Sequence, residues 1–536
     1  MTRFSESGSS EPGLVRVEGD WYSGTWVALR QDDVARKLAA KDATLWGPEA
    51  ESEASIRLGW VDLPASSRPL LAEIEALKAQ LANEDLDHIV LAGMGGSSLA
   101  PEVITRTAGV ELTVLDTTDP NVIRRALGDR LERTVVVVSS KSGGTVETDS
   151  HRRAYAQAFS EADILPERRI VVVTDPGSPL AELAEQQHYR KVFLADPNVG
   201  GRYSALSAFG LVPAGLAGAD IAALLDDAEA LMPDLASSSP QNPALLLGAA
   251  LGAAHNQGRD KVVIAEGSSA ISGFGAWAEQ LIAESTGKRG RGLLPVDIGP
   301  GTRETSGWLT TEDSTYLALG EPDFGAPQIS CDGPLGAMFL LWETAIAIAG
   351  RVIEINPFDQ PNVEAAKQQA RQLLENPSAG DGLPLAFTEG RVEVYGEVPA
   401  ESLSGLFAAL PSLVPSDGYL ALQAYLDRDQ DSAAEQLRNL VAASSGLQTT
   451  FGWGPRFLHS TGQYHKGGHP NGGFLQITGA VEQDLAVPDR AFTFGQLQRA
   501  QAAGDAVVLT EAGRPVIRLH LQDRAAGLMQ LLEAAS

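Results

Sequence analysis

The stretch Asp87-His-Ile-Val-Leu-Ala-Gly-Met-Gly-Gly-Ser-Ser98 decides the fold. Its first half is a short apolar run with the length and composition of a buried β-strand. Its second half is a turn rich in glycine and serine, and residues 99–107 then have the composition of a helix. A buried strand that ends in glycines and leads into a helix is typical of a parallel sheet.

The same alternation of strand and helix repeats along the chain. Apolar runs at 111–115, 133–138 and 169–174 are expected to be strands, with helical segments between them. Because these runs are apolar on both faces, we expect a parallel sheet covered by helices on both sides. A second set begins near residue 240, with a strand expected at 260–266 and a helix at 272–284. The sequence therefore predicts an α/β fold.

This pattern divides the chain into four parts. Residues 1–84 are predicted to form an N-terminal helical arm, 85–238 a first sheet domain and 239–378 a second one. The segment 375–382 (ENPSAGDG) has the composition of a linker. Residues 379–536 again alternate strands and helices, which predicts a C-terminal α/β region.

Composition excludes several classes of protein. The 536 residues include 41 Lys and Arg against 69 Asp and Glu, and the formal net charge of −28 argues against a nucleic-acid partner. Cys331 is the one cysteine, so no disulfide can form within the chain, as expected in a reducing cytosol. We find no apolar run of about 18 residues and no apolar signal core at the N-terminus. We therefore expect a cytoplasmic protein with no membrane partner.

Two hydroxyl-rich turns follow neighbouring strands of the predicted sheet. The first is Gly93–Ser98, and the second is Ser139-Ser-Lys-Ser-Gly-Gly-Thr145. Glycines let backbone N–H groups approach an anion, hydroxyls donate hydrogen bonds to it, and Lys141 adds positive charge. Because parallel strands end at one edge of the sheet, the two turns together indicate a phosphomonoester site.

Each turn taken singly has other interpretations. Gly93 and Gly95 fit two glycines of a dinucleotide fingerprint, with Ser98 in its third position and Asp116 where an acid would bind ribose. Either turn could also be an ordinary strand-to-helix connection without a ligand, with Ser140 as a helix cap.

Further segments carry candidate catalytic groups. Glu284 ends an apolar helix in AESTGK, where a partly desolvated carboxylate is a stronger base, and Glu279 competes for that role. Arg202 follows two glycines in GGRYS, which would let it approach a ligand. Gln360 and Lys367 are seven residues apart in NPFDQPNVEAAK, so a helix would place them on one face.

Three of the eight histidines lie in His459-Ser-Thr-Gly-Gln-Tyr-His-Lys-Gly-Gly-His469. Such a cluster suggests a metal, but it falls in a glycine-rich loop rather than on one helix face, with no cysteine nearby. We therefore expect a histidine that transfers protons, and no metal.

Taken together, the segments GMGGSSLAPE, SSKSGGTVE, GGRYS, AESTGK, NPFDQPNVEAAK and HSTGQ resemble the phosphoglucose isomerases, discontinuously over residues 85–470. The chain is most similar to the isomerase half of bacterial transaldolase–phosphoglucose isomerase fusions. The resemblance implies two flavodoxin-like parallel-sheet domains of the sugar isomerase (SIS) type, a phosphosugar substrate and no cofactor.

The resemblance also implies roles for single residues. Glu284 would be the base that moves a proton between C2 and C1, and Arg202 would stabilise the enediolate. His459 and Lys367 would open the sugar ring, and Gln360 would contact the substrate. The residues expected to surround the substrate and its phosphate are Gly95, Gly96, Ser97, Ser140, Lys141, Ser142 and Thr145.

The order of the motifs departs from the family pattern. In the bacterial single-enzyme pattern the histidine motif precedes the Gln/Lys motif, whereas His459 here follows Lys367. Residues 385–536 would therefore supply the histidine, with His465 as the alternative to His459. The family histidine comes from the partner subunit of a dimer, so we expect a homodimer.

The sequence thus predicts an aldose–ketose isomerase that interconverts glucose 6-phosphate and fructose 6-phosphate. Two other functions stay open at this point. A non-catalytic SIS-type phosphosugar sensor would need the phosphate turns but not Glu284, Lys367 or His459. A dinucleotide-dependent oxidoreductase would instead use Gly93–Ser98 with Asp116.

Overall fold

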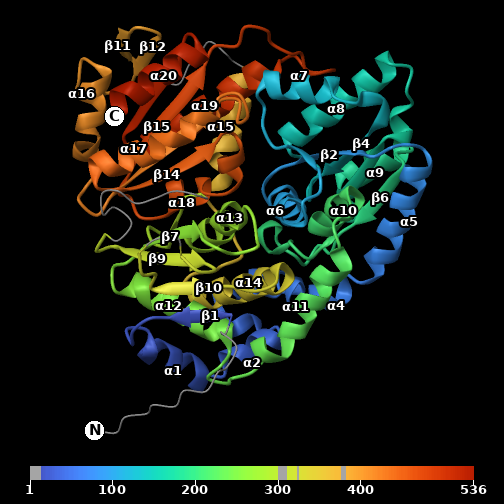
Figure 1. The fold of residues 1–536 in the computed structure, drawn as a ribbon, viewed down its shortest axis with the longest axis vertical. Coiled ribbons are helices and arrows are strands. Elements are labelled where there is room, and N and C mark those ends of the chain that lie inside the picture. The colour runs from blue at the N-terminus through green and yellow to red at the C-terminus, as the bar shows by residue number, and fades with distance from the viewer. Residues whose placement is uncertain (1–13, 300–310, 323–324, 376–381) are drawn as a thin grey trace.

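The computed structural model describes residues 14–299, 311–322, 325–375 and 382–536. These residues form three sheets with helices around them, and Figure 1 shows the first and third sheets above the second. The expectation of an α/β fold with parallel sheets, helices on their faces and a C-terminal α/β region is confirmed. The predicted domain limits remain a proposal.

The first sheet is parallel throughout. Its order is β3 (Thr113–Leu115), β2 (His88–Gly93), β4 (Thr134–Ser139), β5 (Ile170–Thr174) and β6 (Lys191–Leu194). The helices around it are α6 (Leu99–Ala108), α7 (Pro120–Gly128), α8 (Val146–Glu161), α9 (Pro179–Gln186) and α10 (Ala208–Ala217).

Both faces of the central strands β2, β4 and β5 are buried, because these strands are mostly apolar. Leu91 and Val137 share a core with α6 and α10, whereas Val90 and Val136 share another with α7, α8 and α9. The β2 and β4 strands are neighbours, and Gly93 pairs with Ser139 in register. The two hydroxyl-rich turns therefore start side by side at one edge of the sheet.

The second sheet takes one strand from the N-terminal part of the chain. Its order is β1 (Val15–Val17), β10 (Ile329–Cys331), β9 (Ser314–Leu319), β7 (Lys261–Glu266) and β8 (Leu294–Asp297), with only β1 antiparallel to its neighbour. The helices of this part are α11 (Ile221–Leu235), α12 (Pro243–Asn256), α13 (Phe274–Thr286), α14 (Leu335–Val352) and α15 (Val363–Glu375).

The third sheet contains four parallel strands and two antiparallel ones at one edge. Its order is β11 (Leu385–Glu389), β12 (Val392–Tyr395), β16 (Val516–Leu521), β15 (Gly472–Gly479), β13 (Tyr419–Tyr425) and β14 (Gln448–Trp453). Its helices are α16 (Leu403–Ala409), α17 (Gln436–Ser445), α18 (Gly462–Gly467), α19 (Phe494–Glu511) and α20 (Arg524–Ala535).

The C-terminal region packs directly on the second sheet. Val263 and Val296 of that sheet share a core with Tyr419 and Phe474 of the third sheet and with Leu509 of α19. The third sheet and its helices therefore take the place of a separate helical layer on this face.

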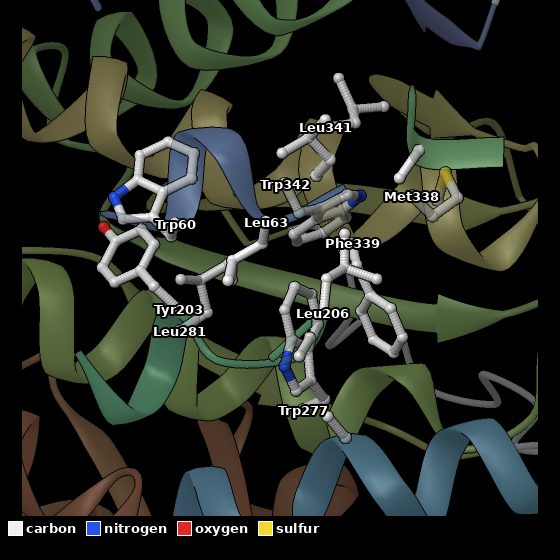
Figure 2. Packing of buried hydrophobic residues seen from close by; sticks show 14 of the residues in the cluster. Trp60, Leu63, Tyr203, Leu206, Trp277, Leu281, Met338, Phe339, Leu341 and Trp342 are labelled. Atoms are coloured by element: carbon white, nitrogen blue, oxygen red, sulfur yellow. The ribbon is translucent and has the colours of Figure 1, made fainter. Parts of the chain in front are cut away.

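The helix α14 is the central helix of the second unit. Although no apolar run of this length is expected from the sequence, α14 could cross a membrane by length and composition, but 89% of it is buried inside the fold. It packs against α11, α12 and α13, and Phe339 meets the Trp277 ring at 4.7 Å (Figure 2). These contacts make α14 a core helix.

The N-terminal arm supports the residues around Arg202. It consists of β1 with α1 (Ser23–Gln31), α2 (Val34–Ala39), α3 (Glu51–Ala54), α4 (Leu63–Ser66) and α5 (Pro69–Asn83). Trp60 is 1% exposed and stacks on Tyr203, with the ring centroids 5.1 Å apart (Figure 2). The arm thus braces the segment next to Arg202.

Replacing Trp60 by Ala should lower the free energy of unfolding by about 3–5 kcal/mol, because a large buried ring leaves a cavity against Tyr203. Urea unfolding followed by fluorescence and circular dichroism measures the change. Ile56→Ala in the same arm is the control, because Ile56 is 47% exposed and should cost little. Equal effects of the two substitutions would contradict a bracing role of Trp60.

Candidate functional site

The first glycine-rich turn lies against the segment that carries Arg202. Gly95 has a positive φ of 55°, and a Cβ at Gly96 would overlap the carbonyl oxygen of Gly201. Only glycine allows the two backbones to come this close. Ser97 lies buried in the single helical turn that follows.

The second turn offers hydroxyls at the N-terminus of α8. The Ser140 and Thr145 hydroxyl oxygens are 3.1 Å apart, and Ser142 is exposed with its Oγ accepting from the Gly144 N–H at 3.3 Å. Lys141 Nζ lies 2.5 Å from Asp175 Oδ2. A bound anion would therefore have to share the lysine with this aspartate.

Glu284 and Arg202 form a buried pair. Arg202 Nη1 lies 3.4 Å from Glu284 Oε2 in the last turn of α13, and both side chains are almost fully buried. The guanidinium also donates to the carbonyl oxygens of Pro357 at 2.5 Å and Asp359 at 3.0 Å. Burial raises the pKa of Glu284, although Arg202 opposes the change. A buried carboxylate with a raised pKa has the properties of a general base.

Glu279, the other candidate base, faces a different part of the molecule. It lines a separate cavity of about 580 Å³ together with Asp297 and Arg438. Burial, together with the Asp297 carboxylate, raises the pKa of Glu279. The structure therefore places Glu284, not Glu279, next to Arg202.

Lys288, just beyond α13, holds the loop that precedes Gln360. Its Nζ lies 2.7 Å from Asp359 Oδ1 and also donates to the Asn356 carbonyl. Burial lowers the pKa of Lys288 to about 7. The same loop accepts from Arg202, so these contacts join the Glu284, Arg202 and Gln360 segments.

Gln360 and Lys367 lie at the exposed side of the site. Both are exposed, and α15, which carries Lys367, packs along α19. The Lys367 charge opposes the burial that raises the pKa of Glu284, and it contributes to the lowered pKa of Glu147. Lys367 is therefore close enough to act electrostatically on both carboxylates.

His459 reaches the first sheet from the C-terminal region of the same chain. Its Nε2 lies 3.0 Å from Oε1 of Glu147, in the first turn of α8. Gln280 donates to the His459 carbonyl at 2.7 Å and approaches Glu284 Oε1 at 3.4 Å. The loop that carries His459 and the helix α13 are thereby joined.

The other two histidines of the motif lie elsewhere. His465 is 2% exposed, packs edge-on to Phe474 at 5.2 Å and stacks on Tyr419 at 6.1 Å. Burial lowers its pKa well below the usual value, so His465 is a neutral core residue. His469 Nε2 lies 3.7 Å from Asp260. The three side chains do not converge on one position.

Asp116, which would bind ribose in the dinucleotide interpretation, forms ion pairs with two arginines. It is 2% exposed, and its carboxylate lies 2.8 Å from Arg456 and 3.5 Å from Arg428. A ribose hydroxyl would have to displace these ion pairs.

Sequence reasoning missed Glu147, Gln280 and Gln501 as candidates. Glu147 lies in the SSKSGGTVE segment, directly after the second hydroxyl-rich turn. A carboxylate in the first turn of a helix at that place could have identified it as a candidate. Gln280 lies one turn before Glu284 on α13, where the helical spacing could have identified it. Gln501 had no comparable signal.

The comparisons with known proteins agree on one family. The family model "Phosphoglucose isomerase" matches residues 72–292. A "Glucose-6-phosphate isomerase" of Synechococcus elongatus is 32% identical over 349 residues, covering 54% of this chain and 66% of the relative. A "Probable glucose-6-phosphate isomerase" of Haloarcula marismortui is 29% identical over 343 residues, covering 54% of this chain and 78% of the relative.

Solved structures share the fold over two thirds of the chain. A hypothetical protein of Thermus thermophilus aligns with a TM-score of 0.57 at 25% identity, covering 67% of this chain and all of that one. A glucose-6-phosphate isomerase of Chlamydia trachomatis aligns with a TM-score of 0.54 at 19% identity, covering 67% and 85%. The family model and the curated relatives thus agree that the chain is similar to the phosphoglucose isomerases.

Proposed function

We propose that this chain interconverts glucose 6-phosphate and fructose 6-phosphate as an aldose–ketose isomerase. The observation that carries the proposal is the buried Glu284 carboxylate, 3.4 Å from the Arg202 guanidinium and tied through Gln280 to the His459 loop. This reaction requires a base for the proton transfer, a cation that stabilises the enediolate, and a histidine that exchanges protons with the sugar. The printed names of the curated relatives support the same substrate pair.

The proposed sequence begins with the closed sugar ring. His459 and Lys367 give a proton to the ring oxygen and take one from the anomeric hydroxyl, which leaves an open-chain aldehyde. Glu284 then removes the proton from C2 and returns it to C1, and Arg202 stabilises the negative oxygen of the enediolate.

The two hydroxyl-rich turns hold the far end of the substrate. The Ser97, Ser140, Ser142 and Thr145 hydroxyls, with Lys141 and the amides near Gly95 and Gly96, are proposed to bind the phosphate. Binding energy from this remote group positions the sugar for both chemical steps. No step of this sequence draws on a metal or an organic cofactor.

A phosphosugar sensor built on the same fold is the alternative function. A sensor does not need the buried Glu284 carboxylate beside the Arg202 guanidinium, nor the His459 ring bonded to the Glu147 carboxylate. Turnover of glucose 6-phosphate by the purified protein separates the two, because a sensor binds the sugar without converting it.

The phosphosugar ligand is consistent with the family. Cytoplasmic location, absence of nucleic-acid and membrane partners, and the homodimer remain proposals. The family's dimer is expected to supply the histidine from its second subunit, whereas His459 here bonds to Glu147 of its own chain. We therefore propose a site that is complete in one chain, whether or not the chain dimerises.

Glu284→Gln should lower kcat roughly 10²- to 10⁴-fold, because the amide cannot accept the C2 proton. The dissociation constant for fructose 6-phosphate should change little, since the phosphate turns are intact. A coupled isomerase assay and calorimetry measure the two quantities.

The matched control is Glu279→Gln, five residues earlier on the same helix, which should keep nearly full turnover. Near-normal kcat in Glu284→Gln, or an equal loss in the control, would refute the role of Glu284.

The acid limb of the pH–activity profile should lie above pH 4.5, the ordinary glutamate value. Burial raises the pKa of Glu284, and the base acts only when ionised, so kcat/KM falls as the pH drops through this raised pKa. Initial rates across the acidic range measure the limb, and Glu279→Gln should leave it in place. A limb at or below pH 4.5 would contradict the assignment.

A further inference from the structure

The Glu147 carboxylate receives two donors that both come from the C-terminal region. Oε1 of Glu147 lies 3.0 Å from His459 Nε2 and 2.7 Å from Gln501 Nε2 of α19. Glu147 is buried, and a lone carboxylate in such a place would be protonated. Burial favours the neutral acid, but the charge and hydrogen bond of the His459 ring, together with a backbone hydrogen bond and the Lys367 charge, lower the pKa of Glu147 to about 2.

The chemistry of its two partners fixes the orientation of Gln501. Its Oε1 accepts from the Thr118 hydroxyl at 2.8 Å, which leaves its NH₂ group for the ionised carboxylate. Thr118 is fully buried and Gln501 is 4% exposed. The amide therefore has both ends bonded inside the protein and little freedom to rotate.

The helix that carries Gln501 is itself firmly held. The Phe494 ring at its start stacks on the His151 ring of α8 at 5.9 Å. One turn before Gln501, Gln498 Nε2 lies 3.4 Å from Asp119 Oδ2. The start of α19 is thus held against α8 by the Phe494 ring, whereas the Gln498 contact is long and does not reach Glu147.

We infer that Gln501 is a positioning residue for ring opening, which holds Glu147 in the orientation that orders the His459 imidazole. This inference rests on the proposed function. With Nε2–H donated to Glu147, Nδ1 is the ring nitrogen left for proton exchange with the sugar. Without the amide, one donor would remain on Glu147 Oε1, and the carboxylate could turn and carry the imidazole with it.

The consequence concerns one step of the reaction only. Ring opening needs His459, whereas the C2–C1 proton transfer needs Glu284, which Gln501 does not touch. Opening and reclosing of the ring interconverts the α and β anomers with no net change of atoms. The anomerisation rate in a Glu284→Gln background therefore reports ring opening alone.

The test adds Gln501→Met to Glu284→Gln and measures α–β exchange of glucose 6-phosphate by NMR, corrected for the spontaneous rate. We expect catalysed exchange to fall about 10- to 100-fold, with the fructose 6-phosphate dissociation constant within about twofold. The matched control is Gln498→Met in the same background, which removes an interface amide of the same helix and should leave exchange unchanged.

Unchanged exchange in the Gln501 variant would overturn the inference, and so would an equal loss in the Gln498 control. If Gln501→Met does not fold, Thr118→Val removes the anchor of the amide without changing its volume and should show a smaller loss in the same direction. Isomerisation by the unaltered chain is measured alongside. Its absence would refute the proposed function itself, whereas its presence with unchanged exchange would refute only the role of Gln501.

Discussion

The contact between His459 and Glu147 is the interaction on which the site depends. It joins the C-terminal region to the first turn of α8, and both partners are largely withdrawn from water. Around it, Arg524 pairs with Asp119 at 2.7 Å and Arg125 pairs with Asp427 across the same boundary. Because breaking a buried pair leaves an uncompensated charge, the C-terminal region cannot move away from the first sheet without a large cost in free energy.

Glu147 and Glu284, the two buried glutamates of the site, have the same side chain but different surroundings, which give their carboxyl groups different pKa values. Glu147 accepts close bonds from His459 and Gln501 and has a lowered pKa, which suits a fixed anion that orders an imidazole. Glu284 has contacts of 3.4 Å to Arg202 and Gln280 and a raised pKa, which suits a base that must take up and release a proton. Weak contacts leave its oxygens available to a substrate.

Local sequence signals predicted much of the fold and part of the site. The apolar run and glycines around residues 87–98 identify β2 and its turn, because a buried parallel strand needs no distant partner to be recognised. The choice between His459 and His465 needed the structure, since His465 is enclosed by Tyr419 and Phe474 from other strands. Gln501 and the pairing of β1 with β10 arise from contacts between distant segments, which neither spacing nor composition encodes.

The central claim is that a single chain contains the whole site, histidine included. The most direct measurement co-expresses and co-refolds two inactive chains, one with Glu284→Gln and the other with His459→Ala, and assays the mixture for isomerisation. If His459 serves the Glu284 of its own chain, every site in every assembly has one defect and activity stays at the level of the separate variants. Recovery of substantial activity on mixing would show that the histidine comes from a partner and would contradict the account.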